Sequence, residues 1–233
     1  MAVILSIDTS TNVCSTALSS DGFIIQHSED FDGPNHAAIL SDFIKRALDH
    51  ISEHEGMKLD AIAVSLGPGS YTGLRIGLSE SKGLAYSLNL PLIGVNTLKI
   101  LAVEAMFSVP DFDPENDLII PMLDARRNEV YTAVYDGTLE AVLEPVPMIL
   151  CPDSFSDLKK KGLIFIGNGA TKAKEIIEIN KENMIFLCDV PPLATSMISL
   201  AERAYFNNDF INIAYSVPIY LKEFQTTTPN PRI

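Results

Sequence analysis

Residues 2–22 read AVILSIDTSTNVCSTALSSDG, and residues 117–137 read DLIIPMLDARRNEVYTAVYDG. Each segment opens with an apolar run that ends at an aspartate, Asp8 in the first and Asp124 in the second, and each closes on an Asp-Gly pair. A short apolar run before polar turn residues predicts a buried strand, and Asp-Gly between alternating segments is typical of a β-hairpin turn. Because the pattern occurs twice, we expect the chain to be an internal duplication.

The elements after the two hairpins also recur in one order: strand, helix, strand, glycine-rich turn and helix. In the first half we expect them at 23–31, 34–56, 60–66, 67–73 and 71–89. In the second half we expect them at 139–144, 152–161, 163–166, 167–169 and 170–180. This order predicts two three-layer α/β lobes, each with a mixed sheet flanked by helices.

The segment PDFDP at 110–114 is rich in proline and aspartate and has no periodicity, so it is the predicted linker between the lobes. The first lobe is then expected to cover residues 1–108 and the second residues 115–233. The last predicted helix, at 194–208, could cross back and pack on the first lobe.

Composition limits the class of function. The chain has 233 residues, with 17 Lys+Arg against 30 Asp+Glu and a formal net charge of −13. A main clamp on nucleic acid needs clustered cations, so we expect any contact with RNA to be indirect, through a partner. The three cysteines have no metal-site or disulfide-framework spacing, and no apolar run approaches the roughly 20 residues of a membrane span. These features predict a cytoplasmic protein without a membrane partner.

Two lobes that each open with a strand, an aspartate and a hairpin suggest a cleft for nucleotide phosphates. The alternative is that these Asp and Thr residues only end strands and form local turns. GPGSYTG at 67–73 precedes a helix, but it lacks the Lys-Ser/Thr of a P-loop, and the next strand ends in Asn96 rather than an acid. The candidate nucleotide-facing residues are Asp8, Thr9, Ser10, Gly67, Gly69, Asp124, Gly167 and Gly169.

The predicted helix 71–89 contains three glycines, Gly73, Gly77 and Gly83. Each glycine inside a helix costs about 1 kcal/mol relative to alanine, so something must offset them. Gly73, Gly77 and Ser81 are spaced by four residues and form one smooth stripe that another backbone could approach. The stripe could pack under the helix 34–56 of the same lobe, or it could join a partner subunit.

The run SLGPGSYTGLRIGLSESKGLAYSLNLPLIGVNTL at 65–98 closely resembles the TsaB (YeaZ) family, whose members take part in threonylcarbamoyladenosine (t6A) biosynthesis on tRNA. ILSIDTST at 4–11, MLDARRNEVY at 122–131 and PIYLKE at 218–223 resemble the same family. The resemblance implies a duplicated actin/Hsp70-like fold (ASKHA, RNase H-like), in agreement with the repeat described above.

The family's catalytic relative, TsaD, carries two metal-binding histidines as HxxxH on the helix after the strand that corresponds to PLIGVN. Thr97 and Leu101 stand at those positions here, and neither side chain can replace an imidazole ligand. The resemblance therefore implies a pseudo-enzyme paralogue with no metal and no cofactor of its own. It implies a heterodimer with TsaD that, with TsaE, supports transfer of threonylcarbamoyl from its adenylate to adenosine 37 of tRNAs reading ANN codons.

In this family the dimer contact involves the first-lobe helices, here 34–56 and 71–89. The same patch could form a homodimer when the chain is alone, and ATP or ADP could bind at the interface of the complex. The expected contact residues are Ile39, Phe43, Gly73, Leu74, Arg75, Ile76, Gly77, Leu78, Ser79 and Lys82.

Two alternatives remain open. One is an autonomous ATPase or small-molecule kinase of the same fold that uses Asp8 and Asp124. The other, which is less favoured, is a peptidase, although the sequence offers no metal triad and no Ser-His-Asp constellation.

Overall fold

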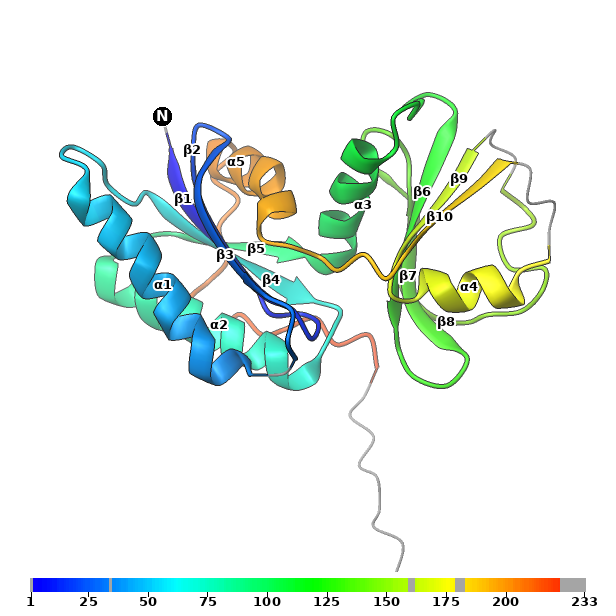
Figure 1. Ribbon diagram of the computed structural model, residues 1–233, viewed down its shortest axis with the longest axis horizontal. Coiled ribbons are helices and arrows are strands. Elements are labelled where there is room, and N and C mark those ends of the chain that lie inside the picture. The colour runs from blue at the N-terminus through cyan, green and yellow to red at the C-terminus, as the bar shows by residue number, and fades with distance from the viewer. Residues whose placement is uncertain (1, 34, 159–161, 179–182, 223–233) are drawn as a thin grey trace, which may run out of the picture.

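The computed structural model describes residues 2–33, 35–158, 162–178 and 183–222, which form two lobes (Figure 1). The first lobe contains a five-stranded sheet of order β3-β2-β1-β4-β5. Its strands are β1 (Val3–Asp8), β2 (Cys14–Ser20), β3 (Phe23–Asp30), β4 (Ala61–Gly67) and β5 (Leu92–Asn96). The first three strands form an antiparallel meander, and β4 and β5 continue the sheet parallel to β1.

The second lobe repeats this sheet strand for strand. Its order, β10-β9-β6-β7-β8, is that of the first sheet read from the other edge, with the same parallel and antiparallel pairs. The strands are β6 (Asp117–Asp124), β7 (Glu129–Tyr135), β8 (Ala141–Ile149), β9 (Gly162–Gly167) and β10 (Met184–Cys188). The predicted duplicated fold, with two mixed sheets flanked by helices, is confirmed.

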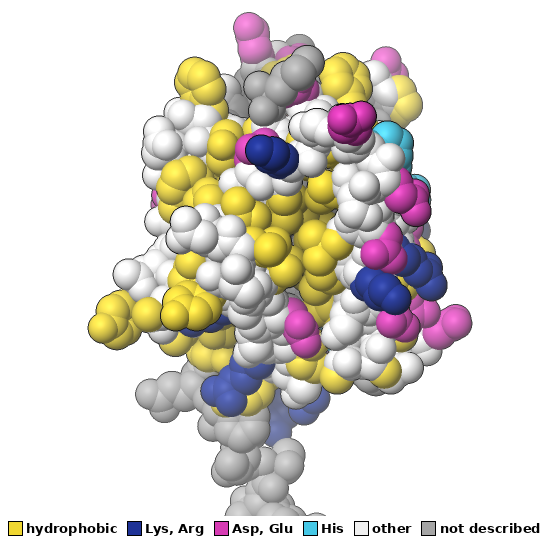
Figure 2. Space-filling view, turned by 90° about the vertical axis from the view of Figure 1, so that its left-hand side faces the viewer, with side chains coloured by type: hydrophobic (Ala, Val, Ile, Leu, Met, Phe, Trp, Pro, Cys, Tyr) yellow, Lys and Arg dark blue, Asp and Glu magenta, His cyan; other side chains and the backbone are white. Residues whose placement is uncertain are grey.

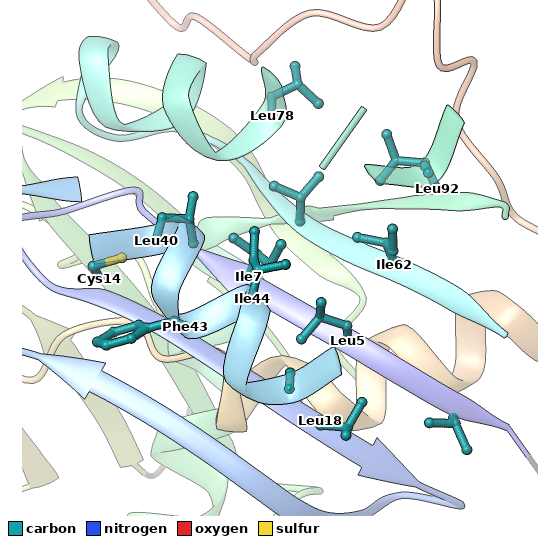
Figure 3. Close-up of a cluster of buried hydrophobic side chains, with 14 residues drawn as sticks. Leu5, Ile7, Cys14, Leu18, Leu40, Phe43, Ile44, Ile62, Leu78 and Leu92 are labelled. Carbon is teal, nitrogen blue, oxygen red and sulfur yellow. The ribbon is translucent and has the colours of Figure 1, made fainter. Parts of the chain in front are cut away.

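Two long helices, α1 (His36–Glu53) and α2 (Tyr71–Leu88), cover one face of the first sheet. Their apolar sides meet alternate residues of β1 and β4 in a single buried cluster (Figure 3). Leu40 and Ile44 of α1 and Leu78 of α2 contribute to this cluster together with Leu5 and Ile7 of β1. The spacing of three and four residues along each helix gives the apolar stripe that the sheet requires.

The helix that follows each sheet in sequence packs mainly on the other sheet. The helix α3 (Thr97–Ser108) follows β5, but Leu98 and Leu101 lie in the core of the second sheet, while Ile100 reaches the first. A 3-10 turn, η2 (Thr195–Met197), leads into α5 (Ile198–Phe206), and Met197 and Ala201 pack on the first sheet (Figure 1). The remaining helix, α4 (Ala170–Ile176), covers the outer face of the second sheet. Among the described residues, no helix is long and apolar enough to cross a membrane.

Some predicted boundaries of the second lobe were wrong. The described part of the predicted helix 152–161 consists of turns, because Ser154 accepts a hydrogen bond from the backbone of Cys151 and Phe155 adopts a positive φ of 67°. Strand β8 continues through Pro145 and Pro147 to Ile149, where the prediction stopped at 144; prolines are tolerated there because β8 is an edge strand.

Candidate functional site

The turn that follows β1 packs directly on the first turns of α2. The hydroxyl of Thr9 donates to the carbonyl of Gly73 at 2.8 Å, and the amide of Ser70 donates to the carbonyl of Ser10 at 2.7 Å. A Cβ atom added at Gly73 would overlap the carbonyl oxygen of Thr9, and one added at Gly77 would overlap its hydroxyl. The glycine stripe therefore accommodates this turn. Gly73 also lies beside His36, the first residue of α1, so one end of the stripe meets that helix as one reading of the sequence had it.

Asp8 ends β1 with a side chain that has no solvent-exposed surface. Its carboxylate accepts hydrogen bonds from the amide of Ser10 at 3.0 Å and from the hydroxyl of Ser10 at 2.9 Å. Burial raises the pKa of Asp8 from 3.8 to about 6, although the hydrogen bonds from Ser10 lower it. In this conformation the carboxyl group is enclosed by its own lobe, and it does not present a charge to solvent.

Asp124, the counterpart in the second lobe, is engaged differently. Its carboxylate accepts from the ammonium group of Lys172 at 2.6 Å, and Lys172 also donates to the carbonyl of Arg127 at 2.5 Å. The amide of Asp124 donates to the side-chain oxygen of Asn168 at 2.8 Å. The loop between β6 and β7 is thereby fastened to the start of α4.

The other predicted nucleotide-facing residues, four glycines, also have local explanations. Gly67 has a φ of +111°, and a Cβ there would lie 2.8 Å from the carbonyl oxygen of Ile219. A Cβ at Gly69 would overlap the carbonyl of Ser10. In the second lobe, Gly167 and Gly169 both leave room for Met122 at the end of β6. Close packing within the chain is therefore sufficient to explain all four.

Thr97 and Leu101, at the positions of the relative's histidines, are completely buried. Thr97 is the first residue of α3, and Leu101 lies in the core of the second sheet. Among the residues that the structure describes, no three His, Cys, Asp or Glu side chains are grouped closely enough to hold a metal ion.

The structure corrects the predicted set of contact residues. Gly73, Leu74, Gly77 and Leu78 are buried inside the first lobe, so they offer no surface to another molecule. The resemblance implied a contact through these two helices, and helix periodicity identifies a stripe but not the element that it faces. Phe43 of α1 is also buried in this lobe, at 8% exposed. The members with more exposed surface are Ile39, Arg75, Ile76, Ser79 and Lys82.

An open groove runs between α1 and α2 on the outer side of the first lobe. Figure 2 shows this face, where hydrophobic side chains gather in the middle beside an edge of acidic and basic side chains. The groove is lined by Ile44 of α1 and by Ser79, Glu80, Gly83, Leu84 and Ser87 of α2.

Of the residues that line this groove, the predicted set contained only Ser79, and Gly83 is one of those that it omitted. It is exposed, and no atom lies within 4 Å of the place where its Cβ would be. The first two glycines of α2 are required by contacts inside the lobe, whereas the described part of the chain gives no contact that requires the third. Its presence in the helix, at a cost of about 1 kcal/mol, was the signal in the sequence.

The C-terminal strap, residues 211–222, lies along the first lobe beside α2. It begins where the amide of Ile211 donates to the carbonyl of Leu92 at 2.8 Å, next to the edge strand β5. Two cations of α2 then hold it: Lys82 donates to the carbonyl of Ser216 at 2.6 Å, and the Nε of Arg75 donates to the hydroxyl of Tyr220 at 3.0 Å.

The strap ends at an ion pair between the lobes. Lys222 of the strap contacts the carboxylate of Glu129, the first residue of β7. The final described residues of the chain therefore join the helix layer of the first lobe to the sheet of the second.

Comparison with known proteins gives consistent matches over most of the chain. The family model described as TsaD, tRNA N6-adenosine threonylcarbamoyltransferase, matches residues 31–218. The tRNA threonylcarbamoyladenosine biosynthesis protein TsaB of Bacillus subtilis (strain 168) is 34% identical over 180 residues, which cover 75% of each chain. The protein of the same name from Escherichia coli (strain K12) is 28% identical over 232 residues, which cover 94% of each chain.

Among solved structures, YeaZ from Pseudomonas aeruginosa has the same fold. It superposes with a TM-score of 0.78 at 26% sequence identity, covering 95% of this chain and 100% of that one. The superposition therefore includes both lobes.

Proposed function

Because this chain belongs to the TsaB (YeaZ) family, we propose that it is a non-catalytic subunit of the machinery that makes threonylcarbamoyladenosine in tRNA. In this proposal it forms a heterodimer with a TsaD-type subunit. Together with a TsaE-type ATPase, it supports transfer of threonylcarbamoyl from its adenylate to adenosine 37 of tRNAs reading ANN codons. In this proposal the protein acts in the cytoplasm.

The observation that carries the proposal is the groove between α1 and α2. Ile44 and Leu84 give it an apolar floor, and the missing side chain of Gly83 lets an incoming helix approach the backbone of α2 closely. Apolar centres with a polar rim are the usual anatomy of protein–protein contacts. The same face could pair with a second copy of the chain when the partner subunit is absent.

Both aspartates bond to groups within this chain. These contacts support the proposal that the subunit carries out no nucleotide chemistry of its own. Asp8 is enclosed and bonded to Ser10, and Asp124 is neutralised by Lys172. In the alternative proposal, an autonomous ATPase, both carboxylates would have to be released before they could position a cation. We therefore favour a site for ATP or ADP at the junction with the partner, formed only in the complex.

The decisive experiment for the activity is t6A formation on unmodified tRNA with each protein omitted in turn. The reaction contains this chain, the TsaD-type and TsaE-type proteins, threonylcarbamoyl-adenylate synthase, threonine, bicarbonate and ATP. We expect no product without this chain and none with this chain alone. Full activity in its absence would overturn the proposed role.

The groove is tested by Gly83→Lys, which adds a long charged side chain to an exposed helical position without a contact inside the lobe. We expect the variant to fold normally and to bind the TsaD-type subunit at least about tenfold more weakly. Ser199→Lys is the matched control, because it adds the same side chain to α5, on the opposite face of the first sheet. Equal affinities for the two folded variants would exclude the groove as the contact.

A further inference from the structure

The C-terminal strap exposes apolar side chains, and hydrogen bonds fix the backbone that carries them. Tyr215 is 85% exposed and Val217 is 68% exposed. In α2, Tyr86 is 81% exposed and lies one helical turn after Lys82, which bonds to the strap. Scattered single apolar residues are normal on a surface, but aromatic side chains grouped on one face are typical of contact sites.

The turn that presents Tyr215 is built from several hydrogen bonds. The side-chain oxygen of Asn212 accepts hydrogen bonds from the amides of Ala214 and Tyr215 at 2.9 and 3.0 Å. The amide of Ser216 donates to the backbone carbonyl of Asn212 at 3.0 Å and closes the turn. Lys82 of α2 donates to the carbonyls on both sides of Tyr215, at 3.5 Å to Ala214 and 2.6 Å to Ser216. The position of Tyr215 is thus fixed relative to α2, although its side chain is buried by nothing in the described chain.

Arg75 lies at one end of the same surface. Its guanidinium stacks 4.0 Å from the centre of the Tyr71 ring, and the hydroxyl of Tyr220 fixes its Nε. Among the described residues no carboxylate forms an ion pair with Arg75, and its side chain is exposed. Because the guanidinium covers the Tyr71 ring, that ring is not free to stack on a nucleic-acid base, and a carboxylate is the better match for the group presented.

We propose that this surface, made of Tyr86, Tyr215, Val217 and Arg75, is a second contact region for the protein partner that docks on α2. This inference rests on the proposed function and extends it. The argument for that occupant is continuity: Arg75, Lys82 and Tyr86 belong to the same helix as the groove residues Ser79 and Gly83. The partner is expected to straddle α2, with an apolar patch against Tyr215 and Val217 and an acidic side chain at Arg75. Tyrosine and arginine are the residues that most often dominate such contacts.

The test measures the affinity of the full chain for the TsaD-type subunit by calorimetry. The strap variant combines Tyr215→Ser and Val217→Ser. Its matched control combines Phe107→Ser and Val142→Ser, which remove an aromatic that is 80% exposed from α3 and a valine that is 56% exposed from β8. We expect the strap variant to bind at least about tenfold more weakly and the control to bind within about twofold of the unchanged chain.

Arg75→Gln tests the charged contact separately. We expect it to weaken binding at low ionic strength and to have less effect at about 1 M salt, where exposed charges are screened. Circular dichroism establishes that each variant is folded.

The outcomes separate this inference from the proposed function. If the strap variant binds normally while Gly83→Lys does not, the strap inference is wrong and the groove stands. If both bind normally, the partner does not use α2 and both proposals fall. If the strap variant keeps its affinity for the protein partner but loses affinity for unmodified tRNA, the surface is a nucleic-acid contact and the inference is overturned.

Discussion

Asp8 is a fully buried carboxyl group with a raised pKa. Its position at the end of β1 was predicted correctly from the sequence, as was its place before a turn of hydroxyl residues. What the sequence could not indicate is that this turn folds inward onto α2, because a strand pattern does not reveal which way the following turn bends. The carboxyl group is consequently enclosed, and its pKa is raised to about 6.

This raised pKa predicts a pH-dependent stability. The folded state holds the proton up to about pH 6, whereas the unfolded chain releases it near 3.8, so folding is favoured at low pH and this contribution is lost as the pH rises from about 4 to above 6. The difference corresponds to about 3 kcal/mol. We expect Asp8→Asn, which cannot ionise, to lack this loss when urea unfolding is measured at pH 4 and pH 7.

The comparison is made against the unchanged chain at both pH values, since other carboxylates titrate in the same range. Parallel stability curves for the two proteins would mean that Asp8 is not enclosed in solution.

At the scale of elements, α2 shows how one helix can contain glycines for opposite reasons. Gly77 faces the hydroxyl of Thr9 and has no room for a methyl group, whereas Gly83 faces open space. We expect Gly77→Ala to destabilise the isolated chain by about 1–3 kcal/mol through overpacking. We expect Gly83→Ala to stabilise it by up to about 1 kcal/mol, because alanine is the better helix former.

Denaturant unfolding of the two single variants measures both effects. The same sign for both would contradict the assignment of Gly77 to the interior and of Gly83 to the surface. The additional variant Thr9→Ala, combined with Gly77→Ala, should recover part of the loss because it removes the colliding hydroxyl.

The elements of the first lobe were predictable because their signals are regular. Alternation, an Asp-Gly turn and long helical periodicity identified β1, β2, β3, α1 and α2 to within a few residues. The second lobe was harder, since its edge strand β8 contains two prolines and β10 has only five residues. The contact set predicted on α1 and α2 contains five buried members, because periodicity alone does not orient a helix between two possible neighbours.

At the scale of the whole molecule, the two lobes share their helices. Ile4, Ala63 and Ile93 of the first sheet are covered by α5, which lies near the C-terminus of the described chain. A fragment of residues 1–110 lacks this cover and also lacks the strap. We therefore expect this fragment to be unstable alone and to form a stable complex when it is co-expressed with residues 111–233.

Size-exclusion chromatography and circular dichroism of the fragments, separately and together, test this expectation. A cooperatively folded, monomeric 1–110 fragment would show that the first lobe does not depend on α5. It would also mean that the predicted linker at 110–114 separates two domains that can fold independently.

The crossed packing of α3 and α5 has a consequence for how such a molecule could arise. In a single half-length ancestor with one sheet, the terminal helix would have lacked the second sheet on which α3 mainly packs today. Two copies could have satisfied each other only by exchanging that helix, as domain-swapped dimers do. Gene fusion would then have preserved an exchange between two molecules as a permanent exchange within one.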